Sequence, residues 1–196
     1  MKGKLNLLII AAAVIVFQSC VLSANKNEKT SAEAGSGELY VCIPCGSSCD
    51  TVVKTSPGIC QHCKMEFVKK STIVHSNIMP ADLYQQILKA GAENIILLDV
   101  RTSEEFNGAA PEKFGRLRNA INIPIQELQA RIKELDGYKD KQIIVYCSHS
   151  HRSPRASYML TQYGFKNVAN LQHGMHMWKE EVTDKSSNDN LYITQL

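Results

Sequence analysis

Short apolar runs alternate with segments of helical periodicity in the second half of the chain. Residues 95–98 and 143–146 are unbroken apolar runs, the pattern of strands buried on both faces of a parallel sheet. Residues 80–90 carry apolar side chains four positions apart behind a first-turn proline and end at Gly91, which predicts a helix. Weaker patterns predict strands at 72–74, 121–123 and 168–171, and helices along 125–135, 156–163 and around Met177 and Trp178, with Trp178 in the core.

This order of elements predicts the fold class. Strands separated by helices of about three turns indicate an α/β domain over residues 71–182, with a parallel sheet covered by helices on both faces. Functional sites in such sheets form at the carboxyl ends of strands. Two predicted strand ends carry reactive residues, namely Asp99 with Arg101, and Cys147. The polar tail, residues 183–196, is predicted to be loosely held.

The N-terminus predicts export. Lys2 and Lys4 precede 13 nearly unbroken apolar residues, Leu5 to Phe17, a length that suits a signal peptide and is short for a membrane span. The following Ser19-Cys20 resembles the lipobox of bacterial lipoproteins, which implies a signal peptide over 1–19 and lipidation of Cys20. The alternatives are an ordinary secretory signal and a retained membrane helix, and in each case the rest of the chain is exported.

Residues 20–38 are rich in Ser, Ala, Asn, Lys, Glu and Gly, which predicts a flexible tether to the membrane. The protein is therefore expected in the bacterial cell envelope, facing the periplasm or the exterior. The whole chain has a net charge of +3, and two of these charges lie in the predicted signal peptide. The low charge argues against a general nucleic-acid binder.

Five of the seven cysteines lie between residues 42 and 63. They include two Cys-x2-Cys pairs separated by 14 residues, and each pair can aim two thiolates at one point. So short a segment cannot bury a stable core, so a bound metal would supply folding free energy. Zinc is preferred and copper(I) remains possible, because both accept thiolates. Disulfides are the alternative in an exported protein. No organic cofactor is predicted.

This segment, residues 39–69, resembles the small heavy-metal-binding, zinc-ribbon-like domain found at the ends of bacterial metal-efflux proteins. The resemblance implies four metal ligands: Cys42, Cys45, Cys60 and Cys63. Cys45 stands where histidine is commoner, and Lys64 stands where glycine is usual. Cys49 and His62 are spare; each could be an alternative ligand, and for His62 we favour a surface role.

The second reactive segment begins at Cys147, between a buried strand and a helix that starts near Ser153-Pro154. A tight turn there points backbone N–H groups inward at a helix N-terminus, which favours the thiolate form of the cysteine. Arg152 adds a permanent cation with two-pronged geometry, so Cys147 and Arg152 are the predicted catalytic residues. The residues predicted to line the substrate loop are Ser148, His149, Ser150, His151 and Ser153.

The length of the loop indicates its chemistry. Four residues separate Cys147 from Arg152, whereas phosphate-binding loops usually have five between cysteine and arginine. The tighter ring leaves room for one sulfur atom. A persulfide on Cys147 is therefore favoured over attack on a phosphate ester. Asp99 is interpreted as structural, anchoring the loop or pairing with an arginine, and Arg101 is left open between support and chemistry.

Four motifs in order resemble single-domain rhodaneses. They are the Asp-x-Arg segment (98–106), the segment ending in Asn-Ile-Pro (115–124), the active loop (145–153) and the C-terminal signature (171–178). The resemblance covers residues 71–182. It implies a five-stranded parallel sheet with helices on both faces and a cysteine-persulfide mechanism.

The chain departs from this family pattern at several positions. Ser150 and Asn119 stand where glycine is usual, Arg116 replaces a histidine, and residues 108–114 are an insertion. Histidines inside the loop are also unusual, while His173 and His176 are expected at the surface. These changes affect the substrate more than the fold.

The sequence therefore predicts an exported, lipid-anchored sulfurtransferase that moves sulfane sulfur from thiosulfate or a persulfide donor to a thiophilic acceptor. One alternative is a metal-handling or sensing protein whose rhodanese-like domain only binds. A phosphatase or arsenate reductase is disfavoured by the length of the loop.

Overall fold

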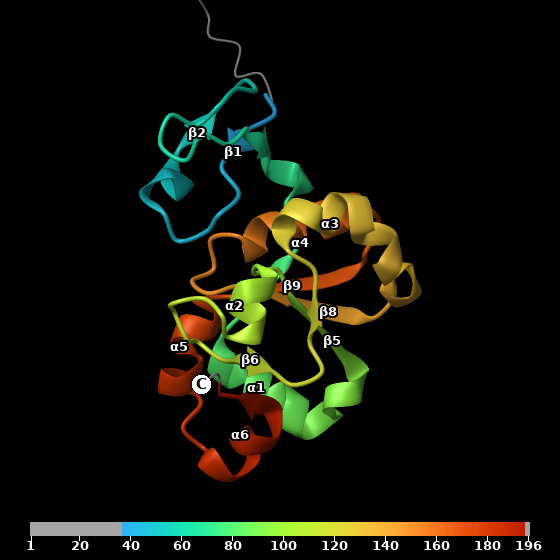
Figure 1. The fold of residues 1–196 in the computed structure, drawn as a ribbon. Coiled ribbons are helices and arrows are strands. Elements are labelled where there is room, and N and C mark those ends of the chain that lie inside the picture. Colours follow the sequence, from blue (N-terminus) through green and yellow to red (C-terminus); the bar gives the residue numbers. More distant parts are fainter. Residues whose placement is uncertain (1–36, 195–196) are drawn as a thin grey trace, which may run out of the picture. The chain divides into compact units, whose positions relative to one another are not determined.

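A five-stranded parallel sheet forms the centre of the structure, a computed structural model that describes residues 37–194 (Figure 1). Its strands are β4 (Ser76–Ile78), β5 (Ile95–Asp99), β7 (Ile121–Asn122), β8 (Gln142–Tyr146) and β9 (Asn167–Leu171). They lie in the order β4-β9-β8-β5-β7, and every neighbouring pair is parallel. This confirms the predicted sheet and brings the carboxyl ends of β5 and β8 side by side.

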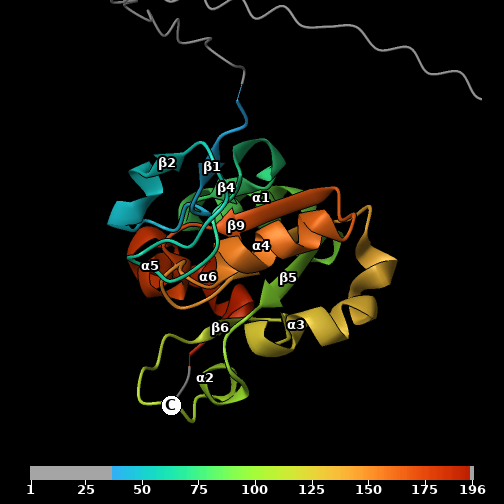
Figure 2. The same ribbon diagram turned by 90° about the horizontal axis from the view of Figure 1, so that it is seen from above.

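Helices cover both faces of this sheet, as predicted. Helices α3 (Ile125–Arg131) and α4 (Ser153–Gln162) pack on one face, and α1 (Pro80–Ala90), α5 (Gly174–Glu181) and α6 (Lys185–Leu191) pack on the other (Figures 1 and 2). Alternation along β8 divides the core accordingly, because successive side chains of a strand point to opposite faces. Ile144 and Tyr146 pack with α1 and α5, whereas Ile143 and Val145 pack with α3 and α4. Trp178 is fully buried, which confirms its predicted place in the core.

Short elements complete the main domain. They are η2 (Lys70–Thr72), η3 (Ala92–Asn94), α2 (Ser103–Asn107), β6 (Arg116–Leu117), η4 (Ile132–Tyr138) and β10 (Tyr192–Ile193). Among the described residues, no helix combines the length and the apolar character that crossing a bilayer requires.

The first predicted strand, residues 72–74, is wrong by a few positions. Thr72 ends a short helical turn and Val74 is 70% exposed, while the strand begins at Ser76. Residues 76–78 are the ones that pair with 169–171 of β9. The β-branched composition of 72–74 suggested a strand, but β-propensity depends on whether a partner is available.

The prediction of a loosely held C-terminal tail is also wrong for the described residues. The segment forms α6 and β10, and β10 pairs antiparallel with β6. Leu191 and Tyr192 are buried, and the Tyr192 hydroxyl donates a 2.6 Å hydrogen bond to the carbonyl of Phe114. Asp184 accepts a hydrogen bond from the buried Tyr84. The polar residues of the tail are thus caps and exposed faces around a few apolar anchors.

The cysteine-rich segment forms a small antiparallel ribbon. Strand β1 (Tyr40–Val41) lies between β2 (Val53–Lys54) and β3 (Val68–Lys69), with the helical turn η1 (Ser48–Thr51) between the first two in sequence. Its small core consists of cysteines and Phe67, with Tyr40 and Val52 packed against it. The ribbon and the sheet domain belong to the same compact unit, and Thr72 is hydrogen-bonded to Tyr158 of α4 at 3.1 Å.

We expect Tyr192→Ala to lower the free energy of unfolding by about 3 kcal/mol, because it removes a buried ring that packs on Gly115. Tyr192→Phe is the matched control, and it should cost only about 1 kcal/mol for the lost hydrogen bond to Phe114. Chemical denaturation measures both values. Equal and negligible effects would show that the tail does not contribute to the fold.

Candidate functional site

Cys147 directly follows β8 at the carboxyl edge of the sheet, as predicted. Its side chain is 1% exposed, and its Sγ lies 3.4 Å from the hydroxyl of Ser153, the first residue of α4. The sulfur therefore lies before the N-terminus of a ten-residue helix, whose unpaired amides and dipole favour negative charge.

The beginning of α5 holds the loop from below. The amides of Met175 and His176 donate 2.9 Å hydrogen bonds to the carbonyls of Cys147 and Ser148. Gly174 makes this approach possible, because a Cβ there would lie 2.4 Å from the Cys147 carbonyl oxygen. The C-terminal signature is thus part of the site, since it fixes the backbone that carries the nucleophile.

The middle of the loop turns through a left-handed residue, Ser150, with φ of 62°. A non-glycine residue in this conformation is strained by about 1 kcal/mol. Asn170 compensates, because its side-chain amide donates a 3.0 Å hydrogen bond to the Ser150 hydroxyl and a 2.9 Å hydrogen bond to Asn77. Asn170 is itself 2% exposed. The predicted strain at Ser150 is thus present and is offset by a buried polar network.

The end of the loop is clamped by Glu105 of α2. Its carboxylate accepts two hydrogen bonds from the Arg152 guanidinium, at 2.6 and 2.7 Å, and a third from the Ser148 hydroxyl at 3.0 Å. Glu105 also closes the capping box of α2 with Thr102. Both planar groups meet in two-pronged geometry, which is the strongest form of such a pair. Arg152 is therefore committed to Glu105 and holds the loop shut.

Charge in this clamp depends on both partners. The Arg152 hydrogen bonds lower the pKa of Glu105 to about 2, against the opposing effect of burial. In return Glu105 raises the pKa of Arg152, and Cys147 adds to that rise, which shows that the guanidinium also lies near the sulfur. A cation at this position stabilises an anionic sulfur on Cys147.

Asp99 and Arg101 pair with each other and are both fully buried. The guanidinium donates to the Asp99 carboxylate at 2.6 and 3.0 Å and to the carbonyl of Gly115 at 2.8 Å. Burial lowers the pKa of Arg101, but the bonds to Asp99 outweigh it and the net direction is upward. The pair ties the end of β5 to the start of β6. Asp99 thus has the structural role predicted for it, and Arg101 shares it.

Exposed imidazoles surround the outer side of the loop. The rings of His149 and His176 lie 4.9 Å apart, and both meet the edge of Phe114, at 5.0 and 5.7 Å. His151 stacks at 6.5 Å on His149. Phe114 belongs to the insertion at 108–114, so the insertion and the unusual histidines form one cluster beside the nucleophile.

Four ribbon cysteines gather their sulfur atoms within 4.8 Å of one another: Cys42, Cys49, Cys60 and Cys63. The Sγ atoms of Cys42 and Cys63 are 3.9 Å apart. A tetrahedral site with metal–sulfur bonds of about 2.3 Å has sulfur–sulfur edges of about 3.8 Å, so the donor set fits zinc or a similar thiophilic ion. All six described cysteines are free thiols.

The predicted ligand Cys45 lies outside this group, and Cys49 takes its place. Asp50 provides the physical reason, because its carboxylate accepts hydrogen bonds from the amides of Cys45 and Gly46 at 2.9 and 2.7 Å. Those amides would otherwise turn toward the Cys42 sulfur. The Cys45 thiol donates to Ser47 and lines a hollow of about 350 Å³ together with the active loop, including His149, Ser150 and His151. The helical turn η1 then carries Cys49 into the cluster.

The second half of the cluster forms as predicted. The backbone amides of Cys63 and His62 donate to the Cys60 sulfur and lower the pKa of that thiol to about 6. Burial instead raises the pKa of Cys42 and raises that of Cys49 to about 11. The turn from Cys60 to Cys63 is therefore a preformed thiolate knuckle, and Cys42 and Cys49 need a cation to ionise. The predicted lipidation residue, Cys20, lies outside the described residues.

Glu105, Asn170 and Gly174 are site residues that the sequence prediction did not select. Glu105 and Gly174 lie inside segments quoted for the family resemblance, so the signal was present but no role was assigned. Asn170 ends a buried strand, where a polar residue among apolar ones is the signal for a network.

Glu105→Gln should destabilise the protein by about 1 to 2 kcal/mol near neutral pH, because it leaves a half-buried guanidinium without its counter-charge. The pKa of Glu105 is lowered in the folded state to about 2. The ionised carboxylate thus stabilises the fold fully above the unfolded pKa of about 4.3. That contribution is lost as the pH falls through about 2, so the difference from wild type should shrink between pH 5 and 2. Unfolding curves across this range measure it; a constant difference would contradict the clamp.

The chain was compared with known proteins. A family model described as the rhodanese-like domain matches residues 79–181, and the ribbon lies outside this match. The uncharacterized protein YqhL of Bacillus subtilis is 30% identical over 115 residues, covering 59% of this chain and 85% of that protein. Thiosulfate sulfurtransferase GlpE of Coxiella burnetii is 28% identical over 97 residues, covering 50% and 83%.

Among solved structures, a rhodanese-related protein from Thermoplasma volcanium is 36% identical, with 55% of this chain and 94% of that chain covered and a TM-score of 0.46. The family model spans more than half of the chain, and its residues include the loop around Cys147, the clamp at Glu105 and the α5 turn at Gly174. The chain belongs to the rhodanese-like family.

Proposed function

We propose that this protein is a sulfurtransferase that carries sulfane sulfur as a persulfide on Cys147. The observation that carries the proposal is the geometry of one sulfur at the N-terminus of α4, within hydrogen-bonding distance of Ser153 and near the cation Arg152. Sulfurtransferases among the relatives support the same chemistry.

The reaction takes two displacements. The Cys147 thiolate attacks the outer sulfur of thiosulfate or of a persulfide. The sulfur–sulfur bond of the donor breaks, and sulfite or a thiolate leaves with the electron pair. A thiophilic acceptor then attacks the outer sulfur of the Cys147 persulfide and releases the thiolate. Both sulfur anions are stabilised by the helix N-terminus and by Arg152.

The short loop supports sulfur over phosphate as the transferred group. Glu105 occupies both prongs of Arg152, and Ser148 shares the same carboxylate, so the guanidinium is not available to grip an oxyanion in two-pronged fashion. A phosphatase or arsenate reductase needs that grip. The histidine and Phe114 cluster beside the loop is the surface that an incoming donor or acceptor meets.

The setting of the reaction is proposed from the N-terminal pattern. Lys2, Lys4, the apolar run and Cys20 support an exported protein held to a membrane of the bacterial cell envelope by a lipid on Cys20. Small-molecule donors and acceptors are then the partners. Neither nucleic acid nor an organic cofactor is part of this proposal.

A second function, metal binding by the ribbon, is favoured by the four convergent sulfurs. Zinc would be held by Cys42, Cys49, Cys60 and Cys63, and copper(I) suits the same ligands. A bound ion would supply a folding constraint for a module whose own core is small. In the alternative in which the protein handles or senses metal, this site dominates and the Cys147 loop only binds.

Purified protein given thiosulfate and cyanide should release thiocyanate, and Cys147→Ser should reduce the rate to the uncatalysed background because no persulfide can form. Cys45→Ser is the matched control, a second non-cluster thiol beside the same hollow, and should still turn over. Thiocyanate is measured by its iron(III) colour. An absence of thiocyanate with wild type, tested with both donor classes, would contradict the enzyme proposal.

The protein should bind one zinc ion per chain, and Cys49→Ser should lose it because three sulfurs cannot complete the tetrahedron. Cys45→Ser should retain it, since that thiol lies outside the cluster. Elemental analysis after gel filtration measures the stoichiometry. Retention by Cys49→Ser together with loss by Cys45→Ser would restore the ligand set predicted from sequence.

A further inference from the structure

The four-sulfur cluster of the ribbon has two unequal sides. On the side of the active loop, three of its cysteines share a cavity of only about 20 Å³ with His151 and Arg155. Such a volume holds about one water molecule. A hydrated or chelated metal ion cannot approach the sulfurs from there.

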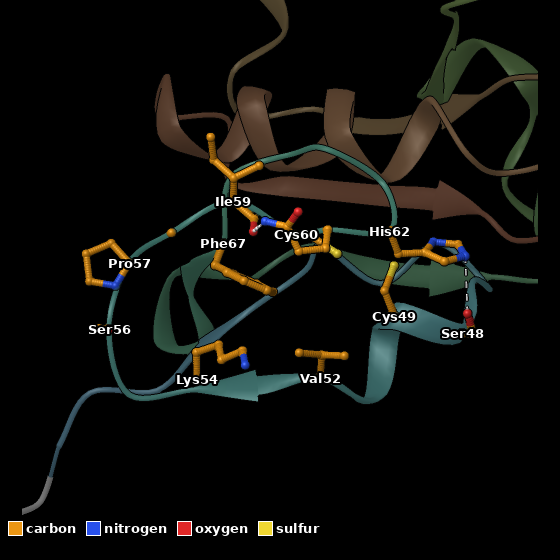
Figure 3. A pocket seen from close by; sticks show the side chains of 12 residues that line it. Ser48, Cys49, Val52, Lys54, Ser56, Pro57, Ile59, Cys60, His62 and Phe67 are labelled. Carbon is orange, nitrogen blue, oxygen red and sulfur yellow. Dashed lines mark hydrogen bonds between the residues drawn. The ribbon is translucent and has the colours of Figure 1, made fainter.

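The other side opens into a hollow of about 580 Å³ (Figure 3). Cys49 and Cys60 are the cluster cysteines in its wall. Apolar side chains, including Val52 and Phe67, line the rest of the wall on the inside. The hollow is wide enough for an ion that still carries several small ligands, so two of the four sulfurs can be reached from solvent by this side alone.

His62 stands on the rim of this hollow, beside Cys49 in the close view (Figure 3). It lies in the turn between Cys60 and Cys63, so its backbone is fixed by the knuckle. Its ring is exposed, and its Nε2 has a long 3.4 Å contact with the Ser48 hydroxyl. An imidazole nitrogen held this loosely can turn from Ser48 to an ion. Imidazole is a good ligand for both zinc and copper.

We propose that this hollow is the route by which a thiophilic metal ion enters and leaves the ribbon, and that His62 is its entry ligand. The inference rests on the proposed metal site. The His62 nitrogen donates its lone pair to an ion delivered as a labile complex with small amino or thiol ligands, and one of those ligands leaves. Cys49 and Cys60 then replace the remaining ligands and the imidazole, and their thiol protons pass to water. No electrons are transferred.

His62 acts on rates and not on affinity. The four cysteines already complete the tetrahedron, so the imidazole is released when the ion is seated. A ligand used only during passage lowers the barrier equally in both directions. The equilibrium constant and the stoichiometry therefore stay the same when it is removed.

The test is stopped-flow metal exchange on the full chain. Zinc-loaded protein is mixed with the coloured chelator 4-(2-pyridylazo)resorcinol for exit, and metal-free protein is mixed with the zinc complex of that chelator for entry. His62→Ala should slow both rate constants by about tenfold, which corresponds to ~1.4 kcal/mol of barrier. Gln61→Ala is the matched control, since Gln61 lies on the same wall without an imidazole, and its rates should equal those of wild type.

His62→Gln separates a ligand from a spacer, because glutamine can still bond to Ser48 but binds zinc poorly. It should be as slow as His62→Ala. Unchanged rates in both His62 variants, with one zinc per chain, would overturn the entry route while leaving the metal site intact. Loss of zinc in His62→Ala would overturn the transient role, because His62 would then be a permanent ligand. Failure of wild type to bind zinc would instead overturn the metal site itself.

Discussion

The ion pair between Glu105 and Arg152 is the contact on which the reactive end of the molecule depends. Glu105 lies in the first turn of α2, next to the end of β5, while Arg152 closes the loop that follows β8. The pair therefore joins two neighbouring strand ends and fixes the span of the loop. Cys147 is placed at the N-terminus of α4 only because that span is short and held at both ends.

The rest of the loop is held by contacts that do not involve reactive groups. The amides at the start of α5 hold the loop's first carbonyls, and Asn170 supports the left-handed turn at Ser150. These contacts come from β9 and α5, on the far side of β8 from Glu105. The nucleophile is thus rigid because several elements of the sheet domain each fix one part of its backbone, as a preorganised anion site requires.

Periodicity predicted the parts of the fold in which burial decides the structure. The runs at 95–98 and 143–146 became the central strands, and the helix over Pro80–Ala90 has the expected bounds. The pattern failed where pairing or a few anchors decide. Residues 72–74 have strand composition but no strand partner, and the polar tail folds because Tyr192 is buried.

In the two reactive segments, sequence spacing predicted the residues better than their partners. Three positions where glycine is usual, Lys64, Asn119 and Ser150, all have φ near 60°, so the resemblance marked left-handed backbone without saying what stabilises it. Spacing alone also chose Cys45 over Cys49, since no pattern shows that Asp50 captures the amides of the first turn. Side-chain to backbone bonds of this kind become visible only in three dimensions.

The central claim is that Cys147 carries the sulfur, and intact-mass spectrometry after brief treatment with thiosulfate or a persulfide donor tests it most directly. Wild type should gain the mass of one sulfur atom, located on the peptide that contains Cys147, and treatment with cyanide should remove it. Cys147→Ser should gain nothing. Sulfur that accumulates equally on the Cys147→Ser variant, or no gain on wild type with either donor, would contradict the account.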